Sequence, residues 1–329
     1  MGRVSTFADA DVIKMATKQF VPVCTDDWYT RRRQDAEGEF FRSMATAAGR
    51  KGEGGATRQG IYVFAADGTV LGYKNAGQDA GVMKQVFRDA LTKFDRLPEK
   101  QRTPGGIAVP DRGKPDPKYT RELPKGGLVV RVNTRILERK GDDIVCGACD
   151  QMGGDRASRD FLWLTKDEVA ALAPAKAEVG HSYPVPEKIA ARIARFHLLD
   201  NTRGEPEFWT KEQVKANTMT LSVTAATADA VDLRLDGAAL MHTGSDPDAG
   251  RGYDVKLRGE LRYRPANGTF DKFDAAALGP HWGDQRFARN ARPGKTPLGV
   301  AFTLADLTKP GNTIPPQGVR YDPPYWGRE

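Results

Sequence analysis

The sequence predicts two parts: an α/β unit followed by an α+β unit with a largely antiparallel sheet. Helical apolar patterns alternate with short β-rich runs in the first hundred residues, whereas apolar and polar residues alternate with a period of two from residue 218. A stretch rich in Pro, Gly, Lys and Asp separates these patterns. The length of 329 residues suits two domains. We therefore expect domains at 1–97 and 126–329, joined by a linker or strap at 98–125.

The first part is expected to run helix, strand, helix, hairpin, helix. Asp9 is a suitable N-cap for the first helix, because its carboxylate can accept from free backbone N–H groups. Asp67-Gly68, between two β-rich runs, is a strong hairpin signal. The expected elements are a helix over 9–18, a strand from Phe20 to Val23, a helix over 26–46, a hairpin over 61–73 and a helix over 78–94.

The second part mixes helices with a later meander of strands. "WLTKDEVAAL" predicts a helix that begins with a capping box between Thr165 and Glu168. "FWTKEQVKAN" repeats this device with Thr210 and Gln213, so we expect a second helix there. After residue 218 the period-two pattern predicts an antiparallel meander with one buried face.

The order of elements across 9–95 resembles the thioredoxin superfamily. The helix "TFADADVI" followed by "FVPV", the hairpin "IYVFAADGTVLGY" and the closing helix "GVMKQVFRDAL" carry the resemblance. In that family a CxxC motif lies just before this helix, upstream of Ser5 here, and only four residues precede Ser5. The family's hairpin proline is replaced within "TRQGIY". The resemblance therefore implies a thioredoxin-like domain without the ordinary active site.

Cys24 has two interpretations. It follows an apolar run and precedes an expected helix, where the partial positive charge of a helix N-terminus can lower a thiol pKa. The alternative is a small apolar residue at a strand end, since free cysteine is commonly buried and inert.

Cys146 and Cys149 form the sole CxxC motif, within "GDDIVCGACDQMGGDRASRD". Three cysteines do not make a disulfide framework. The motif is open to three interpretations: incidental loop cysteines, a redox pair with Cys24 as a third thiol, or half a zinc site. No second pair with metal-ligand spacing is present, so we expect no metal and no cofactor.

"LGPHWGDQRFARNARPG" gathers His281, Trp282, Asp284 and Arg286 into one loop between expected strands. Loops on a rigid sheet often carry sites, and arginines beside an aromatic ring can bind a carboxylate, phosphate or sugar. The alternative is a structural corner in which Trp282 is buried.

The net charge of +7 is modest for this length, so nucleic-acid binding is not expected. Arg31-Arg32-Arg33 is followed at once by acidic residues, which is typical of a solvated helix face. No apolar run is long enough to span a bilayer, so no membrane association is expected. The N-terminus lacks the plan of a secretory signal, and localisation stays open.

These observations predict a binding or scaffold protein without catalytic activity. The missing family elements would leave an incomplete sheet edge from Phe20 to Val23, to be covered by the 98–125 strap, the second domain or a protein partner. The alternative is an atypical thiol-disulfide oxidoreductase that uses Cys146 and Cys149.

Overall fold

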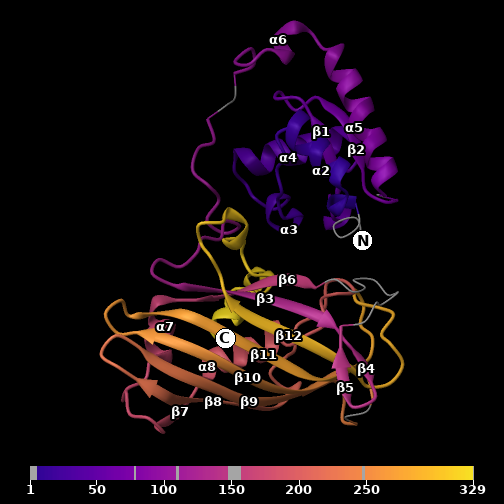
Figure 1. The fold of residues 1–329 in the computed structure, drawn as a ribbon. Helices are drawn as coiled ribbons and strands as arrows, with labels where there is room; N and C mark the ends of the chain where they lie inside the picture. Colours follow the sequence, from indigo (N-terminus) through magenta and orange to yellow (C-terminus); the bar gives the residue numbers. More distant parts are fainter. Residues whose placement is uncertain (1–5, 78, 109–110, 147–156, 247–248, 329) are drawn as a thin grey trace. The chain divides into compact units, whose positions relative to one another are not determined.

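The computed structural model describes residues 6–77, 79–108, 111–146, 157–246 and 249–328. The chain divides into two compact units, Met1–Arg121 and Glu122–Glu329 (Figure 1). Among the described helices, none is long and apolar enough to cross a membrane.

Unit 1 consists of helices packed around one β-hairpin. Helix α5 lies on the hairpin and buries Met83, Phe87 and Ala90 against Val63 and Leu71. The hairpin strands are antiparallel, as the Asp67-Gly68 turn predicts. The elements of unit 1 are η1 (Thr6–Ala8), α2 (Ala10–Gln19), α3 (Asp27–Thr30), α4 (Ala36–Ala47), η2 (Glu53–Gly55), β1 (Ile61–Phe64), β2 (Val70–Lys74), α5 (Ala80–Asp95) and α6 (Glu99–Arg102).

The strand expected from Phe20 to Val23 is wrong. This segment lies in no strand, and the sheet of unit 1 contains β1 and β2 alone among the described residues. Phe20 packs against Phe87, with ring centroids 5.1 Å apart, while Val21 and Val23 are 90% and 78% exposed. The segment has the apolar residues of a strand but no neighbouring strand, and sheet pairing requires one. The predicted sheet edge is therefore an exposed segment with no strand partner among the described residues.

Part of the expected strap is tied to unit 1. The backbone N–H of Asp116 donates to the Asp35 carboxylate at 2.7 Å, and the Asp116 carboxylate accepts from the Gln34 N–H at 2.9 Å. Asp35 also caps α4 by accepting from the Gly38 N–H. This cap divides the helix expected over 26–46 into α3 and α4.

Unit 2 is built on an eight-stranded antiparallel sheet in the order β6-β3-β12-β11-β10-β9-β8-β7. Figure 1 shows these strands side by side in one broad curved sheet. The expected antiparallel meander is thus confirmed. The strands of unit 2 are β3 (Leu128–Ile136), β4 (Glu138–Lys140), β5 (Asp143–Val145), β6 (Ser158–Leu164), β7 (Ser182–Pro184), β8 (Val214–Ala226), β9 (Val231–His242), β10 (Gly252–Arg264), β11 (Thr269–Trp282) and β12 (Thr296–Leu304).

One face of the sheet forms the main core, because alternate residues of each strand point to the same side. Val255, Leu257 and Leu261 of β10 are buried there, while the intervening positions are more exposed. Helices α7 and α8 cover this core through residues such as Val169 and Ile189. The helical segments of unit 2 are α7 (Lys166–Leu172), α8 (Glu187–Arg192), the π-helical turn η3 (Ile193–His197) and the 3-10 turns η4 (Pro310–Asn312), η5 (Gln317–Tyr321) and η6 (Pro324–Trp326).

The two predicted capping boxes have different outcomes. Thr165 and Glu168 form both bonds of the box at the start of α7, as predicted. The helix expected at Thr210 and Gln213 is wrong, because those residues form a turn and β8 begins at Val214. The Gln213 side chain still accepts from the Thr210 N–H at 3.1 Å, so one bond of the box occurs without the helix.

Candidate functional site

The cysteines give no assembled thiol site in the described part of the chain. Cys24 and Cys146 are both exposed free thiols, and they belong to different units. Cys149 lies outside the described residues. Cys24 does not open a helix, because Asp26 is the N-cap of the four-residue helix α3. Within the described ranges, no group of three or more His, Cys, Asp and Glu side chains is placed to hold a metal ion.

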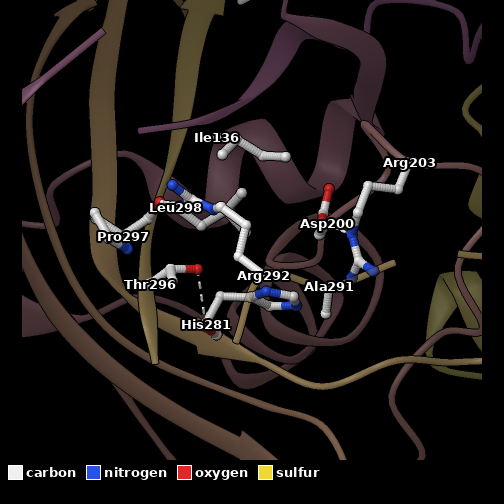
Figure 2. Close-up of a pocket in the computed structure, with 9 residues that line it drawn as sticks. All are labelled: Ile136, Asp200, Arg203, His281, Ala291, Arg292, Thr296, Pro297 and Leu298. Atoms are coloured by element: carbon white, nitrogen blue, oxygen red, sulfur yellow. Dashed lines mark hydrogen bonds and ion pairs between the residues drawn. The ribbon is translucent and has the colours of Figure 1, made fainter. Parts of the chain in front are cut away.

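The loop after β11 meets a turn that lies about eighty residues earlier. His281 and Trp282 are the last residues of β11, so they lie in a strand and not in the expected loop. His281 faces the buried pair Asp200 and Arg203 (Figure 2). The turn begins at Asp200, after η3 and the buried residues Leu198 and Leu199. Gly204 is required at its end, because a Cβ atom there would lie 1.9 Å from the carbonyl oxygen of Phe287.

Arg203 joins the two segments. Its Nε donates to Asp200 at 2.6 Å, and both side chains are 2% exposed. Its Nη1 donates to the Asp284 carboxylate at 2.9 Å and to the Ala288 carbonyl at 3.0 Å. Asp284 also accepts from the Ala291 N–H at 2.6 Å. One buried guanidinium therefore holds the loop in a fixed shape.

The electrostatics keep Asp200 charged and His281 neutral. Burial lowers the pKa of His281 to about 4; Asp200 opposes this change, and the charges of Arg203, Arg251 and Arg292 add to it. Burial alone would raise the pKa of Asp200, but His281, Arg203 and the hydrogen bond from Thr202 bring it below its usual value. At neutral pH the imidazole is therefore an uncharged group beside an ion pair.

The pocket beside His281 is small. Its volume is about 10 Å³, which is about enough to hold one water molecule. A carboxylate, phosphate or sugar does not fit it in this conformation. Figure 2 shows Asp200, Arg203, His281 and Arg292 around it, and its full lining is Ile136, Asp200, Arg203, His281, Ala291, Arg292, Thr296, Pro297 and Leu298.

The four residues predicted as a binding group do not share this pocket. His281 lines it, while Asp284 reaches it only through Arg203. Trp282 is buried and packs on Gly252, where a Cβ atom would lie 2.1 Å from its ring. Arg286 is exposed and lies over the Phe287 ring, 4.8 Å from its centroid. The arrangement matches the structural-corner interpretation of this loop.

Asp200 and Arg203 were not among the residues expected from the sequence. Their one local signal is "DNTRG" directly after an apolar helix end, where an Asp can accept from a backbone N–H two residues later. Asp200 does accept from the Thr202 N–H at 2.9 Å. The partnership of this turn with the 281–292 loop is tertiary, and no spacing along the chain indicates it.

Comparisons with known proteins give no relative: no family model, no curated protein and no solved structure matches this chain.

Proposed function

We propose that this chain is a binding or scaffold protein without catalytic activity, and that residues 20–24 of unit 1 dock an extended segment of a protein partner. The observation that carries the proposal is the exposure of Val21 and Val23, at 90% and 78%, in a segment outside the described sheets. The residues that flank it, Phe20 and Asp26, have extended backbone angles. Strand addition uses unpaired backbone groups for main-chain hydrogen bonds and neighbouring apolar side chains for contacts, and this segment offers both.

The segment presents two unlike edges. In an extended chain, residues two apart direct their backbone N–H and C=O groups to the same side. Val21 and Val23 thus offer donors and acceptors to one edge, while Pro22 gives the other edge a carbonyl but no donor. We therefore assign the docking edge to Val21 and Val23. Phe20, packed on Phe87, anchors the segment to the helical core.

The thioredoxin-like interpretation of unit 1 supports the same proposal. Helices α2, α3, α4 and α5 and the β1–β2 hairpin follow the expected order, with the unpaired 20–24 segment in place of the expected strand. In that family the segment after the first of these helices is a sheet strand. A partner strand alongside Val21 and Val23 would give the segment the neighbour it lacks.

The surroundings of His281 do not suit a catalytic role for this residue. A general base must be able to reach a substrate proton, and a nearby pocket must admit the substrate. His281 is buried beside space for about one water molecule. The carboxylates of Asp200 and Asp284 already accept bonds from Arg203. These groups are occupied in holding the loop.

Hydrogen exchange tests the docking segment. In the purified chain we expect the amides of Val21, Val23 and Cys24 to exchange almost as fast as in an unstructured peptide, since none has a hydrogen-bond partner in the described structure. The matched internal standard is the amide of Ala65, which donates to the Thr69 carbonyl at 2.9 Å at the end of the hairpin. Strong protection of Val21 and Val23 without a partner would mean that the edge is already occupied, and would refute the proposal.

An atypical thiol-disulfide oxidoreductase that uses Cys146 and Cys149 stays the second candidate, because Cys146 is an exposed free thiol. Differential alkylation before and after reduction, read by mass spectrometry, would detect a reversible bridge between the two. Insulin-reduction turnover that disappears in a Cys146→Ser, Cys149→Ser variant would establish this candidate and refute the non-catalytic one. Equal background rates would leave the binding proposal standing.

A further inference from the structure

Unit 1 has an open polar hollow beside helix α4, with a volume of about 610 Å³. Four of its lining residues are Glu39, Arg42, Ser43 and Thr46, which share one face of α4 by their spacing of three and four residues. The other two are Gln34 and Arg58. None of them belongs to the 20–24 segment, so a ligand in this hollow is independent of the proposed docking edge.

Backbone carbonyls, and not carboxylates, hold Arg42 in place. Its Nη1 donates to the carbonyl oxygen of Arg31 at 3.3 Å and to that of Arg33. A guanidinium has five N–H donors, so Nε and Nη2 of Arg42 remain without a protein acceptor among the described residues. The carbonyls fix the orientation of the group without cancelling its charge.

Arg58 is held in the same way. Its Nη1 donates to the Arg42 carbonyl at 2.7 Å and to the Thr46 hydroxyl at 2.9 Å, and its Nη2 donates to the Lys51 carbonyl. Gly52 makes room for this side chain, because a Cβ atom there would lie 2.5 Å from Nε of Arg58. Arg58 is therefore linked directly to the helix that carries Arg42.

Within the described residues, Arg42 and Arg58 lack the carboxylate partners that the nearby Arg31 and Arg33 have. Arg31 pairs with Asp27, and Arg33 pairs with Asp35 at 2.6 Å. In the described part of unit 1, no carboxylate lies within 4.0 Å of the guanidinium of Arg42 or Arg58. Glu39 lines the hollow but pairs with neither. The hollow thus holds two oriented positive charges and one separate carboxylate.

We infer that this hollow binds the phosphate group of a phosphomonoester ligand. Two guanidiniums with free N–H donors suit the several acceptor oxygens of a doubly charged phosphate. The exposed hydroxyl of Ser43, one residue along α4 from Arg42, adds a neutral donor. Glu39 opposes anion binding, so affinity is moderate and depends on salt concentration.

Isothermal titration of the full chain with inorganic phosphate at low ionic strength tests the site, with acetate as a carboxylate probe. We expect phosphate to bind with a dissociation constant of about 1 mM and acetate to bind at least about fivefold more weakly. Ser43→Asp leaves every carbonyl bond of the arginines intact and adds a negative charge, so it should weaken phosphate binding about tenfold. Glu39→Gln removes a like charge and should strengthen binding about twofold or more.

Arg88→Gln is the matched control, because Arg88 is an exposed arginine on α5 whose side chain bonds only to Gln85 among the described residues. It should leave phosphate affinity unchanged. Three results would overturn the inference: no phosphate binding by the wild type, equal affinity for phosphate and acetate, or affinities in Ser43→Asp and Glu39→Gln that match the wild type. Unchanged circular dichroism of the two α4 variants shows that they are folded.

Discussion

His281 should make unit 2 less stable in mild acid. Its pKa is about 4 in the folded chain, mainly because burial disfavours the charged imidazolium, and the ordinary value of 6.5 applies to the unfolded chain. Between these values the unfolded state binds a proton that the folded state does not. The free energy of unfolding therefore falls as pH drops from about 7 toward 4.

The magnitude follows from the two pKa values. One pKa unit corresponds to about 1.36 kcal/mol, so the whole interval corresponds to about 3 kcal/mol. About 2 kcal/mol of this is lost between pH about 7.5 and about 5, above the range where ordinary Asp and Glu side chains titrate strongly. That window isolates the histidine from the general acid denaturation of the chain.

Urea unfolding at several pH values, followed by tryptophan fluorescence, measures this loss. Four of the five tryptophans lie in unit 2, at 163, 209, 282 and 326, so the signal reports mainly on that unit. In His281→Gln the loss between pH 7.5 and 5 should shrink by about 2 kcal/mol. Equal losses in the wild type and His281→Gln would show that His281 titrates normally and is not enclosed as described.

Two further predictions concern unit 2. Arg203→Ala should lower the free energy of unfolding by about 3 to 5 kcal/mol in urea melts, because it leaves Asp200 buried and charged without its partner. The control Arg234→Ala breaks an exposed ion pair and should lower the free energy of unfolding by less than about 1 kcal/mol. Similar losses in the two variants would contradict the structural role of Arg203. Thr165→Ala should lower the free energy of unfolding by about 1 kcal/mol in the same assay, because it removes the capping box of α7. Thr210→Ala should change this free energy by less than about 0.5 kcal/mol, because only the backbone N–H of Thr210 bonds to Gln213. Equal effects would mean that the cap at α7 contributes nothing to stability.

The elements that the sequence predicted well depend on local patterns. Strands β8, β9 and β10 follow from the alternation of apolar and polar residues, which places their apolar side chains on one face. Strand β11 was not predicted from this pattern. The β1–β2 hairpin follows from Asp67-Gly68, and α7 from its capping box. Each signal lies within about a dozen residues, so tertiary contacts reinforce it and do not decide it.

The predictions that failed concern residues whose structure depends on contacts with residues far apart in the sequence. The run from Phe20 to Val23 is apolar enough for a strand, but no strand lies beside it among the described residues. The motif at Thr210 has cap-like residues, yet Val214 pairs with Met241 and draws the chain into the sheet. Asp200 and Arg203 meet the 281–292 loop only after the fold forms. Local propensity therefore predicted the wrong structure, or no site, wherever a distant partner was decisive.

Site-specific photo-cross-linking in the natural host, with a photoreactive residue in place of Val21, is the decisive test of the docking segment. We expect a discrete protein adduct from position 21, and none from position 179, where a valine 70% exposed in unit 2 serves as the control. Val23→Pro should abolish the adduct because it removes a docking-edge donor, whereas Val23→Thr keeps that donor and should preserve the adduct. No discrete adduct from position 21, or an adduct that survives Val23→Pro, would contradict docking at this edge.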